Sequence, residues 1–161
     1  MTVRATSRGA QRTSLEGTRA EVLICGASFA GLAVARELAG SEASVLVLDR
    51  YEIGERQTSA CACPTPWLEA LGLTDSIKQE LPYMSFTTPG GSARYRLPWS
   101  WSSFDYRRLC ELLWDQCGQA RFETAKVESV GEQQADGTIN VITDRGTISA
   151  PLVVDALGWR R

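Results

Sequence analysis

The chain has 161 residues, 43% of them hydrophobic and 22% charged, a composition that is ordinary for one folded globular domain. A formal net charge of -2 gives the protein no general attraction to nucleic acid. A membrane-spanning helix needs about 20 consecutive apolar residues, and no apolar run in the sequence is nearly that long. We therefore expect a cytoplasmic protein without an integral membrane segment. The absence of histidine excludes imidazole metal ligands and Ser-His-Asp hydrolases within this chain.

Residues 1 to 19 form a polar leader with four arginines and one acidic residue, Glu16. Such a segment offers little apolar surface to bury, so we expect a disordered extension before a domain that spans residues 20 to 161. An organelle transit peptide has a similar composition and is the alternative.

The first part of the domain has the pattern of a βαβ unit that binds a dinucleotide. We expect a buried strand, a turn, a helix and a second strand at Val22 to Cys25, Gly26 to Gly31, Leu32 to Leu38 and Val45 to Leu48. Asp49 follows the second strand, where a carboxylate can accept hydrogen bonds from a ribose.

The turn reads Gly-Ala-Ser-Phe-Ala-Gly and departs from the GxGxxG pattern at its middle position. Gly26 permits the tight turn, and Gly31 lets the helix pack closely on the strand. Ser28 replaces the middle glycine, but serine is small and its hydroxyl could itself donate to a phosphate oxygen. The first amides of the helix add donors and the positive end of the helix dipole, so we expect the turn to bind a pyrophosphate.

Further helices and strands follow from periodicity and turn residues. The expected helices are Pro66 to Leu71, Thr74 to Leu81 and Phe104 to Cys117. The expected strands are Tyr83 to Thr88, Ala93 to Pro98, Ala125 to Val130, Thr138 to Thr143, Thr147 to Ala150 and Leu152 to Val154. The strands from residue 125 to 150 form a meander, and residues 82 to 103 form an excursion toward the substrate side.

The chain has five cysteines, an odd number that argues against a disulfide framework. Cys25, Cys110 and Cys117 are expected to be core residues. Cys61 and Cys63 form a CxC motif, for which a zinc site or a redox pair is the less favoured interpretation because no second ligand pair is present. We therefore expect no metal site.

Three segments carry a family resemblance: GASFAGLAVARELA followed by VLVLDR, WLEALGL, and PLVVDALGWRR after a meander. On these segments, residues 20 to 161 resemble the N-terminal part of the FAD-dependent oxidoreductases with a glutathione-reductase-type fold. That group includes aromatic hydroxylases, geranylgeranyl reductases, lycopene cyclases and flavin-dependent halogenases. The resemblance implies an α/β, Rossmann-like βαβ fold with a central parallel sheet and an antiparallel β-meander, truncated before the substrate domain.

The resemblance also implies that FAD is the cofactor. The residues implied to contact it are Gly26, Ala27, Ser28, Phe29, Ala30, Gly31, Asp49, Arg50, Arg56, Ser59, Arg107, Val127, Ala156 and Gly158. The family commonly has an arginine at the position of Tyr106, beside Arg107, and either residue or neither could reach the cofactor.

The end of the last strand departs from the aromatic hydroxylases. Their Ala-Asp-Gly is replaced by Asp155 to Gly158, with Leu157 at the position of the acid. NAD(P)H could be the reductant, but the departure puts its direct docking at this site in doubt. The pattern is closer to the reductases, cyclases and halogenases.

Three functions fit these observations. The first is an FAD-dependent oxidoreductase, monooxygenase-like or reductase-like, that acts on a small organic substrate and is represented by its FAD-binding portion. The second is a non-catalytic nucleotide-binding fragment that needs a separately encoded C-terminal half, or a homo-oligomer, to complete it. The third is an NAD(P)-binding dehydrogenase domain, which the meander disfavours. No side chain is assigned a catalytic role, because the flavin carries the chemistry in this family.

Overall fold

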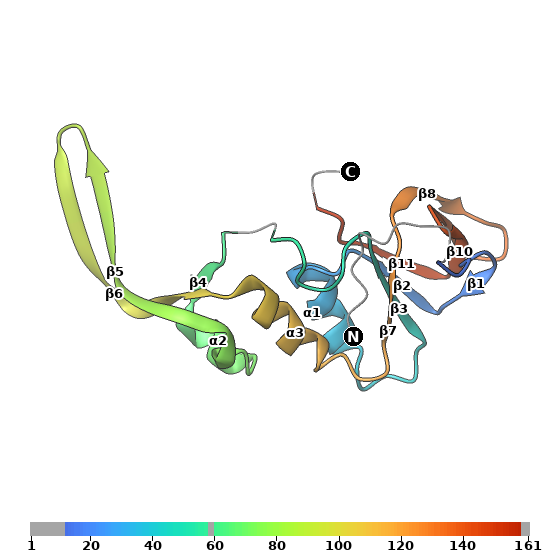
Figure 1. The fold of residues 1–161 in the computed structure, drawn as a ribbon, viewed down its shortest axis with the longest axis horizontal. Coiled ribbons are helices and arrows are strands. Elements are labelled where there is room, and N and C mark those ends of the chain that lie inside the picture. The colour runs from blue at the N-terminus through green and yellow to red at the C-terminus, as the bar shows by residue number, and fades with distance from the viewer. Residues whose placement is uncertain (1–11, 58–59, 159–161) are drawn as a thin grey trace.

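The structure is a computed structural model that describes residues 12 to 57 and 60 to 158 (Figure 1). Its elements in chain order are β1 (Thr18–Arg19), β2 (Val22–Cys25), α1 (Phe29–Glu37), β3 (Val45–Asp49), β4 (Ala62–Pro64), α2 (Thr65–Ala70), η1 (Thr74–Ser76), β5 (Ile77–Thr88), β6 (Gly91–Phe104), α3 (Tyr106–Trp114), β7 (Arg121–Thr124), β8 (Val127–Gln133), β9 (Ile139–Thr143), β10 (Gly146–Ala150) and β11 (Leu152–Asp155). Within these described residues, no helix combines the length and the hydrophobicity needed to cross a bilayer.

A parallel sheet in the order β11-β2-β3-β7 forms the centre of the fold. Strand β2 is buried along its whole length, and so are the first four residues of β3. Both strands read as continuous hydrophobic runs because each of their faces is covered, as is usual in parallel sheets. The predicted α/β fold with a central parallel sheet is therefore confirmed.

Successive residues of the two central strands enter two different cores. Ile24 and Val47 pack with α1 and α3 on one face of the sheet. Leu23 and Leu46, which are register partners, pack on the other face with buried residues of β9 and β10. Because side chains alternate along a strand, these short strands hold helices on one face and the meander on the other.

The second sheet has the order β1-β10-β9-β8, with antiparallel pairing from β8 to β10, so the predicted meander is confirmed. Strand β1 adds to it in parallel. Leu15 is buried, and its amide donates to the carbonyl oxygen of Arg145 at 2.7 Å. The expectation of a disordered leader is therefore wrong for residues 12 to 19, because backbone pairing with β10 orders a segment whose composition is polar. Residues 1 to 11 lie outside the described residues.

The helix expected at Thr74 to Leu81 is also wrong. Only the short 3-10 turn η1 forms there, and β5 begins at Ile77. Pro82 disfavours helical backbone at Leu81, and a long antiparallel pairing with β6 is available to the segment.

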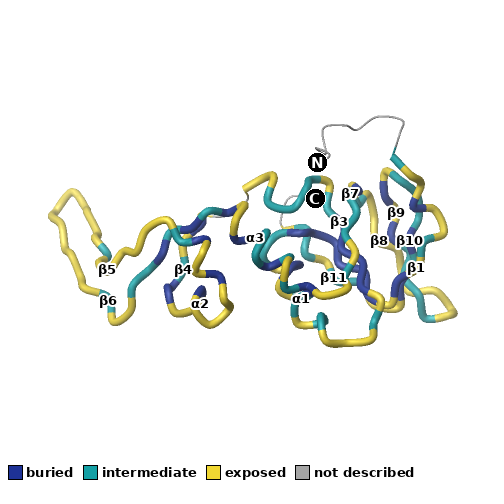
Figure 2. Tube along the Cα trace, turned by 60° about the horizontal axis from the view of Figure 1, so that its bottom comes forward, coloured by how far each residue is buried: buried dark blue, intermediate teal, exposed yellow. Residues whose placement is uncertain are grey.

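Strands β5 and β6 form a long hairpin that projects from the rest of the molecule (Figure 1), and both expected strands of the excursion lie in it. Its outer part is exposed along both strands, in contrast to the buried central strands (Figure 2). Tyr95 is the register partner of Met84, and Phe86 lies two residues further along β5, so these three side chains share one face. That face is apolar and largely exposed, with Phe86 and Tyr95 in an edge-to-face contact.

This contrast in burial predicts different stability effects for two truncations. Leu46→Ala is expected to lower the free energy of unfolding by about 2 to 5 kcal/mol, because Leu46 is 1% exposed and its removal leaves a cavity. Phe86→Ala is expected to cost about 1 kcal/mol or less, because Phe86 is 55% exposed. Urea unfolding followed by circular dichroism measures both. Equal losses would show that the hairpin is packed far more tightly than its exposure indicates.

Candidate nucleotide-binding site

A cavity of about 970 Å³ lies at the carboxyl ends of β2, β3 and β11, beside the first turn of α1. This is the edge at which open parallel sheets bind their ligands. The cavity is lined by Ala27, Ser28, Phe29, Ala30, Asp49, Arg50, Tyr51, Glu52, Gly54, Arg56, Gln57, Tyr106, Ala125, Lys126, Val127, Glu128, Ser129, Val130, Asp155, Ala156, Leu157 and Gly158.

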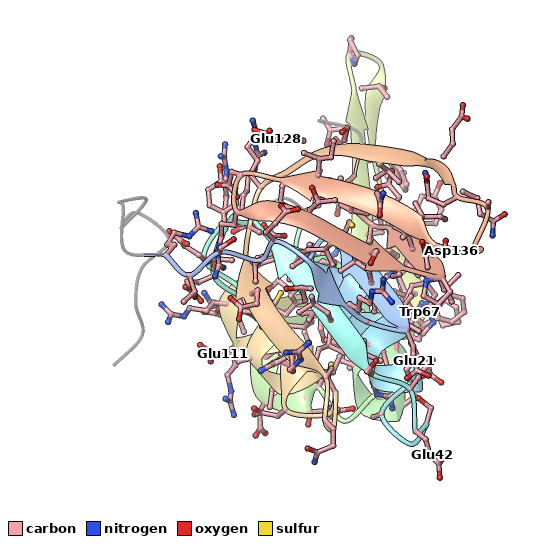
Figure 3. All side chains as sticks on the ribbon, turned by 90° about the vertical axis from the view of Figure 1, so that its right-hand side faces the viewer. Glu21, Glu42, Trp67, Glu111, Glu128 and Asp136 are labelled. Atoms are coloured by element: carbon pink, nitrogen blue, oxygen red, sulfur yellow. The ribbon has the colours of Figure 1, made fainter. Side chains whose placement is uncertain are left out.

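The meander supplies the wall that faces the turn. The two labelled acids of its β8–β9 hairpin, Glu128 and Asp136, lie at opposite ends of that hairpin (Figure 3), and Glu128 is the one that lines the cavity. Sequence reasoning placed only Val127 there and missed the flanking residues from 125 to 130. They could have been found from their position in the chain, because they directly follow β7 at the carboxyl edge of the parallel sheet, but β7 itself was not predicted.

The two glycines of the turn are required by close backbone contacts. Gly26 has a φ of +115°, and a Cβ there would overlap the carbonyl oxygen of Ala156. A Cβ on Gly31 would overlap the carbonyl oxygen of Gly26. Ser28 has φ -95° and ψ -170°, an extended conformation that any residue adopts. The departure from glycine at this position therefore needs no backbone strain.

Asp49 holds the turn in place with both oxygens of its carboxylate. Oδ2 accepts a hydrogen bond from the amide of Ala27 at 2.9 Å, and Oδ1 accepts one from the amide of Tyr51 at 3.0 Å. An ionised carboxylate has about four acceptor positions, so it can accept further hydrogen bonds from the cavity. The predicted ribose ligand is thus also a fixed part of the turn.

Helix α1 points its N-terminus into this cavity. Ser28 is its N-cap residue, and its carbonyl oxygen accepts from the amide of Leu32 at 3.0 Å. The amides of Phe29, Ala30 and Gly31 come before the first intrahelical donor, so helix geometry gives them no acceptor within α1. Together with the helix dipole they form a site that favours an anion.

Tyr106, and not Arg107, reaches the cavity from α3. The Tyr106 hydroxyl donates to Oγ of Ser28 at 3.1 Å, and its ring lies 5.1 Å from that of Phe29. The side chain of Arg107 is 65% exposed and pairs with Glu111 at 3.0 Å. The structure therefore does not bring the predicted Arg107 into the site and brings Tyr106 there instead.

The two other predicted arginines lie at the cavity around one aromatic ring. Arg50 and Arg56 each place the guanidinium carbon 5.1 Å from the ring centroid of Tyr51, and Arg56 donates to the Tyr51 hydroxyl. Ala156 and Gly158 line the cavity at the end of β11. The predicted Ser59 lies outside the described residues.

Burial changes the ionisation of groups at and near the site. It raises the pKa of the Cys25 thiol to about 12, with a further contribution from Asp155. It also raises the pKa of Glu52, a lining residue, together with the nearby Glu55 and against the opposing effect of Arg12.

Burial raises the pKa of both thiols of the CxC motif as well, Cys61 and Cys63. Both are therefore thiols at neutral pH and poor nucleophiles. Over the described ranges 12 to 57 and 60 to 158, no group of three or more cysteine and acidic side chains is placed to hold a metal ion.

The contacts at the turn predict that Gly31 tolerates no side chain. Gly31→Ala is expected to lower the free energy of unfolding by about 1 to 3 kcal/mol, because the added methyl group would overlap the Gly26 carbonyl. Gly40→Ala is the matched control, since a Cβ at Gly40 meets no atom within 4 Å. Thermal or urea unfolding of both variants measures the difference. A Gly31→Ala protein as stable as the control would contradict the close approach of α1 to the turn.

The sequence profile of a family described as "Lycopene cyclase protein" matches residues 21 to 161. No curated protein sequence gives a significant match.

Several solved structures share the fold. A geranylgeranyl bacteriochlorophyll reductase-like protein from Thermoplasma acidophilum is 14% identical, with a TM-score of 0.72 over 86% of this chain and 39% of that one. The p-nitrophenol 4-monooxygenase PnpA from Pseudomonas putida DLL-E4 is 17% identical, with a TM-score of 0.69 over 86% and 41%. The halogenase PltM, in complex with phloroglucinol and FAD, is 18% identical, with a TM-score of 0.65 over 85% and 34%. The chain thus spans well under half the length of each.

Proposed function

Because the chain belongs to the lycopene cyclase protein family, we propose that it binds FAD in the cavity beside α1 and forms the FAD-binding part of a flavin-dependent oxidoreductase. The observation that carries this proposal is the convergence of three features on one cavity. These are the N-terminus of α1, the Asp49 carboxylate, and the wall formed by the residues around Val127. The fold is the one seen in the PltM halogenase, whose structure was solved with FAD.

The residues present suit such a ligand. An anionic pyrophosphate would accept hydrogen bonds from the first amides of α1 and from the Ser28 hydroxyl. Asp49 would accept hydrogen bonds from the adenosine ribose, and Arg50 would lie beside the adenine. Arg56, Ala156 and Gly158 would approach the flavin side. A cavity of about 970 Å³ lies at the upper end of the range for small-molecule sites, as a dinucleotide requires.

Bound FAD would supply the redox chemistry, while this chain supplies position and electrostatics. The buried thiols near the turn take no part in this proposal, because raised pKa values keep them protonated. Asp155 accepts a hydrogen bond from the amide of Leu157 at 3.1 Å and thereby shapes the end of β11. Leu157 lines the cavity where an aromatic hydroxylase would present a carboxylate, so this end of the cavity suits an apolar contact better than direct NAD(P)H docking.

For the reaction and the substrate, the family name adds a second candidate beside flavin-dependent oxidation or reduction, namely cyclisation of a lycopene-like polyene, an isomerisation without net electron transfer. The substrate chamber would be completed by residues outside the matched region. The solved enzymes carry more than half of their length outside it, so a complementary polypeptide or a longer form of this chain would supply that part.

Titration with FAD and with NADH tests the proposal. The purified chain is expected to bind FAD saturably, with quenching of flavin fluorescence. Asp49→Ala is expected to weaken binding by about 10- to 100-fold, since a hydrogen bond to a charged group contributes about 1.5 to 3 kcal/mol. Asp136→Ala is the matched control, because Asp136 lies at the far end of the β8–β9 hairpin.

Unfolding curves of both variants separate a loss of binding from a loss of fold, because Asp49 also holds the turn. Binding of NADH without binding of FAD would favour a dehydrogenase domain and contradict the proposal.

A further inference from the structure

Ser28 and Tyr106 depart from the usual pattern of FAD-binding chains at two places that are distant in the sequence, and the structure brings them together. The Tyr106 hydroxyl donates to Oγ of Ser28 at 3.1 Å, and both residues line the cavity. Ser28 carries the only polar side chain of the turn from Gly26 to Gly31. We propose that this hydroxyl pair is a pyrophosphate-positioning device, in which Tyr106 orients the Ser28 hydroxyl toward a phosphate oxygen of the dinucleotide.

The backbone at Ser28 accommodates a side chain at this position of the turn. Its extended conformation carries no strain, unlike the left-handed conformation of Gly26. The serine is also the N-cap residue of α1, and its side chain makes no capping hydrogen bond there. The hydroxyl therefore lies at the positive end of the helix without being used to close that end.

Tyr106 is held rigidly enough to act as a fixed donor. It is 7% exposed, and its ring packs against Phe29, which in turn contacts Phe104 edge to face. It occupies the first helical position of α3, directly after the N-cap Asp105, whose carboxylate accepts from the amide of Arg108 at 3.1 Å. Helix capping and aromatic packing thus fix where the phenol oxygen lies.

Hydroxyl chemistry explains why Tyr106 would donate to Ser28 and Ser28 would donate to the phosphate. A hydroxyl accepts with its oxygen lone pairs and donates with its own proton, which can rotate to a new acceptor. When Ser28 accepts from Tyr106, its O–H bond is polarised and becomes a better donor to an anionic oxygen. Tyr106 therefore acts through Ser28 as a positioning residue, and the pair replaces the close backbone approach that a glycine would allow.

A double-mutant cycle on FAD affinity tests this inference, which rests on the proposed FAD binding. Ser28→Ala is expected to raise the Kd for FAD about tenfold, the loss of one charge-assisted hydrogen bond. Tyr106→Phe, which keeps the ring and its packing, is expected to raise the Kd about threefold to tenfold. The double variant should bind no more weakly than Ser28→Ala alone, because Tyr106 then has no hydroxyl to orient. The Kd for ADP, which contains the pyrophosphate without the flavin, should change by the same factors.

Tyr95→Phe is the matched control, since it removes a phenol oxygen from the exposed hairpin. Its Kd should equal that of the unaltered chain, and thermal unfolding should show that Tyr106→Phe is folded. Tighter FAD binding by Tyr106→Phe would show that the hydroxyl obstructs the site and would overturn the inference. The inference would also be overturned if Tyr106→Phe raised the Kd for FAD by the same factor in the Ser28→Ala variant as in the unaltered chain. A chain that binds neither FAD nor ADP would overturn the proposed function itself, and the inference with it.

Discussion

The close approach of four backbone segments at Gly26 is the constraint on which the rest of the structure depends. The Gly26 amide donates to the carbonyl oxygen of Leu48 at 2.7 Å, which joins the end of β2 to β3. Its missing side chain admits the carbonyl of Ala156 after β11, and Gly31 in turn admits the Gly26 carbonyl beneath α1. Because the segments meet at this point, the carboxyl ends of the parallel strands and the N-terminus of α1 open into the same cavity. The positions of the proposed anion site and of Asp49, the proposed ribose ligand, follow from this packing requirement.

Much of this arrangement could be predicted from the sequence because it is local. The βαβ unit combines hydrophobic runs, small residues at a turn and a following acid within about 30 residues, and each of these has a distinct physical cause. The errors concern pairing over a long range. Residues 12 to 19 look disordered by composition, yet Leu15 is buried and Thr18–Arg19 form β1 because β10 offers an open edge. Strand β7 was missed because its four residues, at the sheet edge, are neither fully buried nor strongly hydrophobic.

In the candidate site, too, the sequence did not indicate which individual side chains would meet in space. Successive residues of a helix point about 100° apart, so neighbours such as Tyr106 and Arg107 face different surroundings. The family pattern left open whether Tyr106, Arg107 or neither residue would reach the cofactor. Packing against Phe29 selects Tyr106, whereas the ion pair with Glu111 holds Arg107 on the outer face. No signal in the sequence linked Ser28 to Tyr106, which lies 78 residues further along the chain.

The cavity and the β5–β6 hairpin differ in how they are supported by the rest of the fold. Part of the cavity wall directly follows β2 and β3, whose side chains are buried in the two cores, whereas other wall residues, among them Arg56, Gln57 and Glu128, are exposed. The outer part of the β5–β6 hairpin has one apolar face and only two strands, a combination that is marginally stable in water by itself. No residue of β5 or β6 lines the cavity, so the proposed nucleotide site does not depend on direct contacts from the hairpin. The proposed nucleotide site is thus separate from the exposed β5–β6 hairpin.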